Sequence, residues 1–316
     1  SIIGCLLLAG MAMTSCDFLD VVPKENATGE DMTKDRQAAL NYLYSCYGYL
    51  PQPNEGTSSL DLLTGDEVVT AFEHETFASF PKGNYTASRP VISYWNTLYQ
   101  GIRQCLSFEE ELNKSGNFSG LEDKDRADYK AQVKFLLGYY DFLLTRCYGP
   151  IILVTTKPDA TTKPEDYLPR TSYDVCVDSI VNYFDQAAKG LPATRTGTQS
   201  SEFGLATSVA AKAMKAKTLL YAASPLFNGN SKFYSDFKGK DGNTLMPLTY
   251  DASKWEKARD AYKDAIDAAE AAGYHLYTRA DYKLSANGYP ANPYVRALRY
   301  TCTDYEQEGE TAGSNC

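Results

Sequence analysis

The chain has 316 residues, of which 43% are hydrophobic, so it can bury a sizeable core as one large domain or as two. Its net charge of −9 argues against a nucleic-acid-binding surface, because such surfaces use lysine and arginine to neutralise phosphates. Its only two histidines, His74 and His275, leave no multi-histidine metal site and little histidine-dependent catalysis.

The N-terminal segment reads as an export signal. Residues 1–16 carry no charge, and the apolar run 2–13 is too short to span a bilayer but has the length of a signal-peptide core. The run ends in Met-Thr-Ser before Cys16, as in a bacterial lipoprotein signal. We therefore predict a signal peptide over residues 1–15 and a lipid anchor on Cys16. An ordinary secretory signal cut beside it is the alternative.

Two segments in the first third of the chain show apolar residues at the three- and four-residue steps of a helix. The first is predicted over residues 34–50, with Thr33 as its N-cap and Pro51 beyond its end. The second is predicted over residues 91–114. The connection 52–90 carries several aromatic rings, and a loop this long in a compact domain is usually functional or disordered.

The segment 129–154 is apolar on two adjacent helical faces and should therefore be covered on both. Gly138 interrupts it at a cost of about 1 kcal/mol relative to alanine, which indicates close approach of a neighbouring backbone. Asp123 or Asp125 can cap the helix, and Gly149 followed by proline ends it. With the preceding helix it should form an antiparallel hairpin.

The next predicted helix covers residues 173–189. Thr171 and Asp174 stand in capping-box positions at its start, and Gly190 is expected to end it.

Two more helices are predicted over residues 208–223 and 254–272. The first is rich in alanine and ends before Ser224-Pro225, and the second opens with a capping box at 253–256 and closes at Gly273. Several helix starts are separated by about 34 residues, the spacing of tetratricopeptide helix pairs. The sequence thus predicts a mainly all-α fold, a tetratricopeptide-like helical array with long ligand-binding loops.

Four short stretches of the sequence, taken together, form a recognisable combination. They are Cys16 followed by Leu-Asp-x-x-Pro at 19–23, an aromatic helix ending in Tyr-Gly at 134–150, Pro-Arg-Thr-Ser at 169–172, and an alanine-rich helix ending in Ala-Ser-Pro at 210–228. The combination resembles the SusD/RagB family of nutrient-binding surface lipoproteins of Bacteroidetes. The resemblance implies a tetratricopeptide-like scaffold and, as partner, a SusC-like TonB-dependent transporter of the outer membrane. Family members usually continue further, so residues 16–316 are expected to be one domain that is incomplete at its C-terminus.

Glycan contacts in this family follow no fixed motif, so candidates can be placed only by location. Rings on loops, with asparagine or arginine nearby to bond hydroxyl groups, are the expected contacts. The candidate glycan-binding residues are Phe80, Tyr85, Arg89, Tyr282, Asn287 and Tyr289. Packing of the loops onto the helices explains each of them equally well. Trp95 lies on an apolar helical face and is assigned to the core.

Other motifs point to no catalytic residue, metal or cofactor. Glu73-His74-Glu75 is not a zinc-protease motif because position 78 is alanine. Asp236, Asp241 and Asn243 lack the spacing of an EF-hand. Phosphate-binding glycine loops and paired Cys-x-x-Cys motifs are missing from the sequence.

The predicted function is that of a non-catalytic, surface-exposed lipoprotein of the cell outer membrane. It captures oligosaccharides or polysaccharides and passes them to a SusC-type transporter, and it is not an enzyme. The alternative is a tetratricopeptide-type scaffold that binds a protein or peptide. A glycoside hydrolase is the third hypothesis, but it needs two carboxylates about 5 to 10 Å apart, which nothing in the sequence places.

Overall fold

A computed structural model of the chain describes residues 31–51, 76–159, 161–163, 166–195 and 202–276. The chain divides into two compact units, residues 1–268 and 269–316. In the described residues all regular structure is helical, and strand-like pairing is limited to isolated bridges. The predicted all-α fold class is confirmed.

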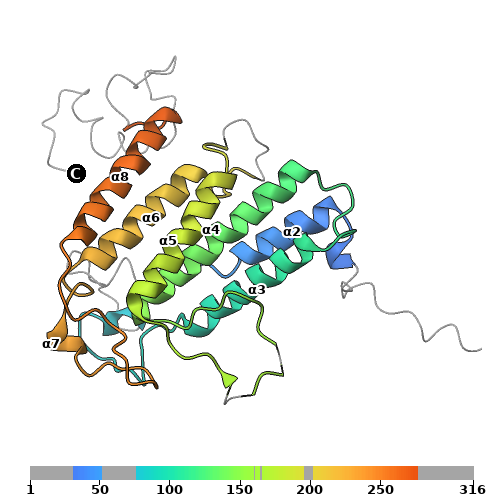
Figure 1. Cartoon of the computed structure of the whole chain (residues 1–316). Coiled ribbons are helices and arrows are strands. Elements are labelled where there is room, and N and C mark those ends of the chain that lie inside the picture. Colours follow the sequence, from blue (N-terminus) through green and yellow to red (C-terminus); the bar gives the residue numbers. More distant parts are fainter. Residues whose placement is uncertain (1–30, 52–75, 160, 164–165, 196–201, 277–316) are drawn as a thin grey trace, which may run out of the picture. The chain divides into compact units, whose positions relative to one another are not determined.

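The six long helices correspond to the six predicted ones. The elements are η1 (Asp31–Thr33), α2 (Arg36–Tyr47), η2 (Thr76–Ser79), α3 (Trp95–Asn113), α4 (Asp123–Tyr148), α5 (Tyr173–Gly190), α6 (Ser208–Ala223), α7 (Ser231–Tyr234) and α8 (Ser253–Ala271). Within the first unit α2 packs on α3, α3 on α4, α4 on α5 and α5 on α6 (Figure 1). α4 also contacts α2 and α6 and is therefore the central helix of the array.

The first helix starts differ from the predicted ones. Asp35, not Thr33, caps α2, and its carboxylate accepts a hydrogen bond from the Ala38 N–H at 2.9 Å. α3 begins at Trp95, four residues later than predicted. α4 begins after Glu122 without a side-chain cap. The two predicted capping residues, Asp123 and Asp125, lie inside its first turn, where their negative charges interact favourably with the positive end of the helix dipole.

Both predicted capping boxes are absent. Ser172 precedes α5 and makes no side-chain capping bond, so neither Thr171 nor Asp174 caps that helix. At the start of α8, the Asp251 carboxylate accepts a hydrogen bond from the Ser253 N–H at 2.9 Å. Ser253 therefore belongs to the helix, and the acceptor at its start lies two residues earlier.

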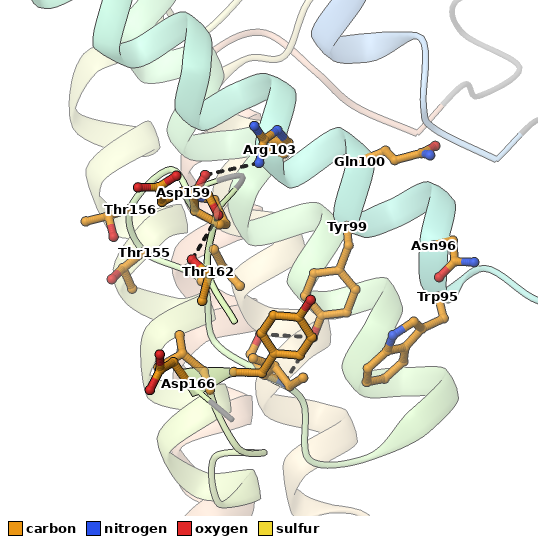
Figure 2. Close-up of a pocket in the computed structure, with 15 residues that line it drawn as sticks. Trp95, Asn96, Tyr99, Gln100, Arg103, Thr155, Thr156, Asp159, Thr162 and Asp166 are labelled. Atoms are coloured by element: carbon orange, nitrogen blue, oxygen red, sulfur yellow. Dashed lines mark hydrogen bonds between the residues drawn. The ribbon is translucent and has the colours of Figure 1, made fainter. Parts of the chain in front are cut away.

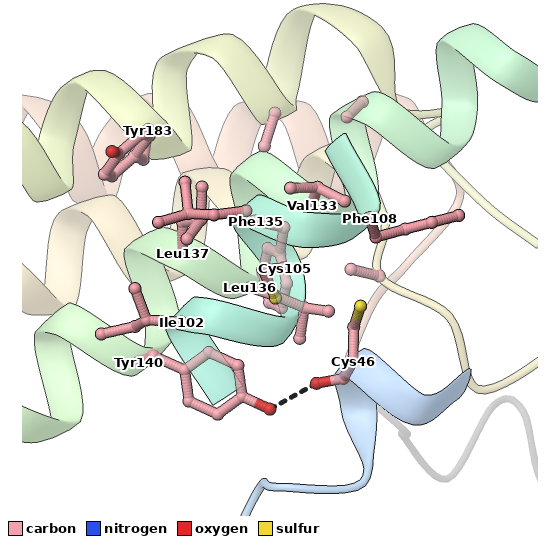
Figure 3. Close-up of a cluster of buried hydrophobic side chains, with 14 of the residues drawn as sticks. Cys46, Ile102, Cys105, Phe108, Val133, Phe135, Leu136, Leu137, Tyr140 and Tyr183 are labelled. Atoms are coloured by element: carbon pink, nitrogen blue, oxygen red, sulfur yellow. Dashed lines mark hydrogen bonds between the residues drawn. The ribbon is translucent and has the colours of Figure 1, made fainter. Parts of the chain in front are cut away.

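Both sides of α4 are covered, as its two apolar faces predict. On the α3 side Gly101 leaves room for the ring of Tyr140, because a Cβ at this glycine would lie 2.7 Å from the ring. The Tyr140 hydroxyl donates a hydrogen bond to the Cys46 carbonyl of α2. The surrounding side chains form one buried cluster (Figure 3), which includes Ile102, Cys105, Phe108, Val133, Phe135, Leu136, Leu137 and Tyr183.

On the other side, two glycines allow α4 and α5 to approach closely. A Cβ at Gly138 would lie 3.2 Å from atoms of Tyr183 and Phe184, so its close neighbours are side chains of α5 rather than backbone. Gly190 was predicted to lie just beyond the end of α5, but the helix includes it as its last residue. A Cβ there would lie 2.7 Å from the Cβ of Ala131. Helix contact, not termination, requires this glycine.

A buried polar network joins α2, α4 and the chain before α6. Arg195 donates two hydrogen bonds to the Asp128 carboxylate, at 2.9 and 2.7 Å, and one to the Ala206 carbonyl at 3.2 Å. Gln132 also donates to that carbonyl, at 3.0 Å, and accepts a bond from the Tyr47 hydroxyl. The network satisfies the backbone of a connection that would otherwise be buried without partners.

α4 ends as predicted, at a residue that tolerates positive φ. Gly149 has φ of 70°, and its N–H donates to the Thr145 carbonyl at 2.9 Å. In the second unit the described residues contain the end of α8. Gly273 there has φ of 85°, which confirms the predicted close of that helix.

Candidate functional site

The chain that follows α4 is held against α3. The Tyr99 hydroxyl accepts a hydrogen bond from the Ile152 N–H and donates one to the Ile152 carbonyl, both at 2.9 Å. Further along α3, the Arg103 guanidinium donates to the Pro158 carbonyl at 3.1 Å. These contacts fix a segment without regular secondary structure along one side of a rigid helix.

A pocket of about 700 Å³ lies between this segment and α3 (Figure 2). This volume is within the range of about 300 to 1,000 Å³ that is usual for small-molecule sites. Fifteen residues line it: Trp95, Asn96, Tyr99, Gln100, Arg103, Ile152, Val154, Thr155, Thr156, Pro158, Asp159, Thr162, Asp166, Tyr167 and Leu168. Both sides of the pocket therefore combine apolar surface with hydrogen-bonding groups.

Two rings from α3 form one wall of the pocket. The Trp95 and Tyr99 centroids are 5.0 Å apart, with the ring planes inclined at 58°. Trp95 also meets the edge of Tyr148 at 5.2 Å, and the guanidinium of Arg170 lies 5.1 Å from its ring centroid. Arg170 is fixed in turn by donating to the Tyr148 and Pro150 carbonyls at 3.1 and 2.6 Å. The indole ring is thus positioned by the protein.

The core assignment of Trp95 holds only in part. The ring packs against the core cluster, but the residue is partly exposed and lines the pocket. On the other side of the pocket, Tyr167 is 60% exposed and Leu168 is exposed as well. Large apolar side chains in this state offer contact area to a ligand.

The uncharged polar lining can bond hydroxyl groups in both directions. Asn96 and Gln100 come from α3, and three threonines come from the facing segment. Amides and hydroxyls each supply donors and acceptors, which suits a ligand rich in hydroxyl groups.

One carboxylate of the pocket is held in its ionised form. The Thr161 N–H and hydroxyl both donate to the Asp159 carboxylate at 2.8 Å. These bonds, with a smaller contribution from the Arg103 charge, lower the pKa of Asp159 below its ordinary value. A general acid needs a raised pKa, so this group is unsuited to protonating a leaving group.

The structure brings three of the predicted site residues together. Phe80 and Tyr85 have ring centroids 5.3 Å apart, and Arg89 donates to the Asn84 side chain at 2.9 Å in the same exposed turn. None of the three lines the pocket. Their role in binding stays a prediction.

The remaining predicted functional residues lie outside the described residues. These are Cys16, Tyr282, Asn287 and Tyr289. None of the helices in the described part of the chain is long and apolar enough to cross a membrane.

Comparison with known proteins places the chain in a family. The SusD-like family described as "Starch-binding associating with outer membrane" matches residues 17–220, well over half of the sequence. The chain belongs to this SusD-like family. Its members are described by binding rather than by catalysis, in agreement with the prediction that the chain is not an enzyme. No curated protein gives a significant match.

Solved structures support the same assignment. The protein BT4246 is 33% identical, with a TM-score of 0.67, over 87% of this chain and 49% of that chain. A SusD-like protein from Bacteroides fragilis NCTC 9343 is 25% identical, with a TM-score of 0.51, over 62% of this chain and 37% of that one. A SusD homologue from Bacteroides thetaiotaomicron VPI-5482 is 21% identical, with a TM-score of 0.57, and shares the fold over 85% of this chain and 44% of that chain. This SusD-like chain spans about half the length of these relatives or less.

Proposed function

We propose that this SusD-like chain is a non-catalytic glycan-binding protein and that the pocket between α3 and residues 152–168 holds the sugar. The observation that carries the proposal is a preformed pair of rings, Trp95 and Tyr99, in a lining that also supplies two amide side chains and three threonines. A pyranose has an apolar face of C–H groups and an edge of hydroxyls. The rings suit the face, and the amides and threonines suit the edge.

Preorganisation of the pocket supports binding without a large conformational change. Trp95 is held by Tyr148 and by Arg170, and Tyr99 is held at its hydroxyl. Rings fixed before the ligand arrives lose little side-chain freedom on binding, so more of the contact free energy contributes to affinity.

We further propose that the protein is a surface lipoprotein of the outer membrane, anchored through Cys16, which delivers oligosaccharides to a SusC-type TonB-dependent transporter. The family's described association with the outer membrane supports the location, and the sequence resemblance supports the anchor and the partner. Affinity purification from detergent-solubilised outer membranes tests the partner. Recovery of other proteins, without a channel of this type and without glycan binding, would favour the peptide-binding scaffold instead.

Tryptophan fluorescence tests the pocket directly. The chain has two tryptophans, so Trp255→Phe leaves Trp95 as the sole indole reporter. A polysaccharide that retards the protein in a native gel should change the emission of Trp95 in this variant.

Removal of the indole should weaken binding. We expect Trp95→Ala to lower the affinity for that polysaccharide about tenfold, the equivalent of one good ring contact. Trp255→Ala on α8 is the matched control, because this indole is 41% exposed and does not line the pocket. Equal losses in the two variants, or full affinity in Trp95→Ala, would place the glycan elsewhere, with the turn that holds Phe80 and Tyr85 as the next surface to test.

A further inference from the structure

The residues that line the pocket include more negatively charged than positively charged side chains. Three of the fifteen lining residues carry charge, and they are Arg103, Asp159 and Asp166. All three are exposed, so each can act on a bound ligand. The pocket therefore presents two carboxylates and one guanidinium, within a chain whose net charge is −9.

The single cation of the lining is already engaged by the protein. Arg103 donates to the Pro158 carbonyl at 3.1 Å, and Figure 2 shows this contact on the side of the pocket where Asp159 lies. The carboxylate of Asp159 is held ionised by its two hydrogen bonds from Thr161. Its negative charge is therefore a fixed property of the site at neutral pH.

Two cations close to the pocket, Lys157 and Arg170, also have partners. Lys157 forms an ion pair with Glu110 at 3.1 Å. Arg170 donates to two backbone carbonyls and stacks on Trp95.

We propose that the pocket selects uncharged glycans over acidic ones, and that Asp159 and Asp166 determine this selectivity. The inference rests on the proposed function, because it takes the pocket as the glycan site. A uronate, sulfate or sialate group bound in this pocket would add a negative charge to a lining that already holds two carboxylates and one guanidinium. One such like-charge contact at a protein surface lowers affinity about tenfold, and the effect weakens as salt screens it.

Matched polysaccharides that differ only in charge provide the test. Suitable pairs are methyl-esterified and de-esterified homogalacturonan, dextran and dextran sulfate, and soluble starch and carboxymethyl starch. Each is cast into a native gel at low ionic strength. We expect the wild-type protein to be retarded by the neutral member of at least one pair and much less by its acidic counterpart.

Substitution of the carboxylates should reduce this discrimination. The double variant Asp159→Asn and Asp166→Asn should raise the acidic-to-neutral affinity ratio about tenfold or more. Asp178→Asn with Asp236→Asn is the control, since it changes the net charge equally at two exposed positions outside the pocket. Added sodium chloride should narrow the wild-type difference between the members of a pair.

Three outcomes would overturn the inference. Wild-type retardation by an acidic member that equals or exceeds that by its neutral counterpart contradicts selection against charge. Equal effects of the two double variants would assign the discrimination to net charge rather than to the pocket. Retention on none of the neutral or acidic polysaccharides is a different result, because it contradicts glycan binding itself and removes the inference with it.

Discussion

Asp141 carries a carboxyl group in the middle of the apolar core. It lies on α4 with 2% of its surface exposed, and one of its oxygens has no hydrogen-bond partner among the described residues. Burial raises its pKa from an ordinary 3.8 to about 8. Because the folded state binds this proton more tightly than the unfolded chain does, the carboxyl lowers the free energy of unfolding progressively as the pH rises from about 4 to about 8.

An uncharged isostere should remove this pH dependence. We predict that Asp141→Asn raises the free energy of unfolding by about 1 to 3 kcal/mol at pH 8. At pH 4.5, where the carboxyl is protonated in the folded state, the substitution should have a much smaller effect. Urea unfolding of both proteins at the two pH values measures this. Asp178→Asn, at an exposed position of the next helix, is the control. A difference between wild type and Asp141→Asn that is the same at both pH values would contradict the assignment.

At the scale of elements, the pocket depends on how residues 152–168 are fastened to α3. Tyr99→Phe keeps the ring but removes both hydrogen bonds to Ile152. We predict weaker glycan binding with a stability loss of only about 1 kcal/mol, because Ile152 is only partly buried. Binding in native gels and thermal melting measure the two effects.

The control for that variant is Tyr250→Phe, which alters an exposed tyrosine outside the pocket. Unchanged glycan affinity in Tyr99→Phe would show that the segment keeps its position without this fastening. A large loss of melting temperature would show instead that Tyr99 supports the whole helix array.

Helix existence could be predicted from the sequence, whereas helix starts often could not. α6 was predicted with its observed bounds, because Pro225 marks its end locally, and in the structure Thr207 caps its start. The start of α3 was placed too early, since apolar residues before Trp95 continue the helical period. The acceptors at the starts of α2 and α8 depend on the backbone path of the preceding turn, which periodicity does not reveal.

Five of the fifteen residues that line the pocket come from α3. Trp95, Asn96, Tyr99, Gln100 and Arg103 recur at the spacing of one helical stripe, and a polar residue follows each ring. The other ten come from a segment without periodicity, whose place against α3 is set by contacts between residues more than fifty positions apart.

At the scale of the whole molecule, the lipid anchor on Cys16 remains to be tested. We predict that Cys16→Ser releases the protein from the outer-membrane fraction and leaves its glycan affinity unchanged, since the pocket is built from residues 95–168. Fractionation of cells with immunodetection measures the first effect, and native gels measure the second. Full retention of the variant in the outer membrane would contradict anchoring through this residue.

The polar network around Ala206 also bears on when the chain can fold. The hydroxyl of Tyr47 accepts a hydrogen bond from the Ala206 N–H, 159 positions further along the chain. Contacts of such sequence separation form slowly, and during synthesis they must wait until both partners have emerged from the ribosome. The docking of α2 is thus completed late.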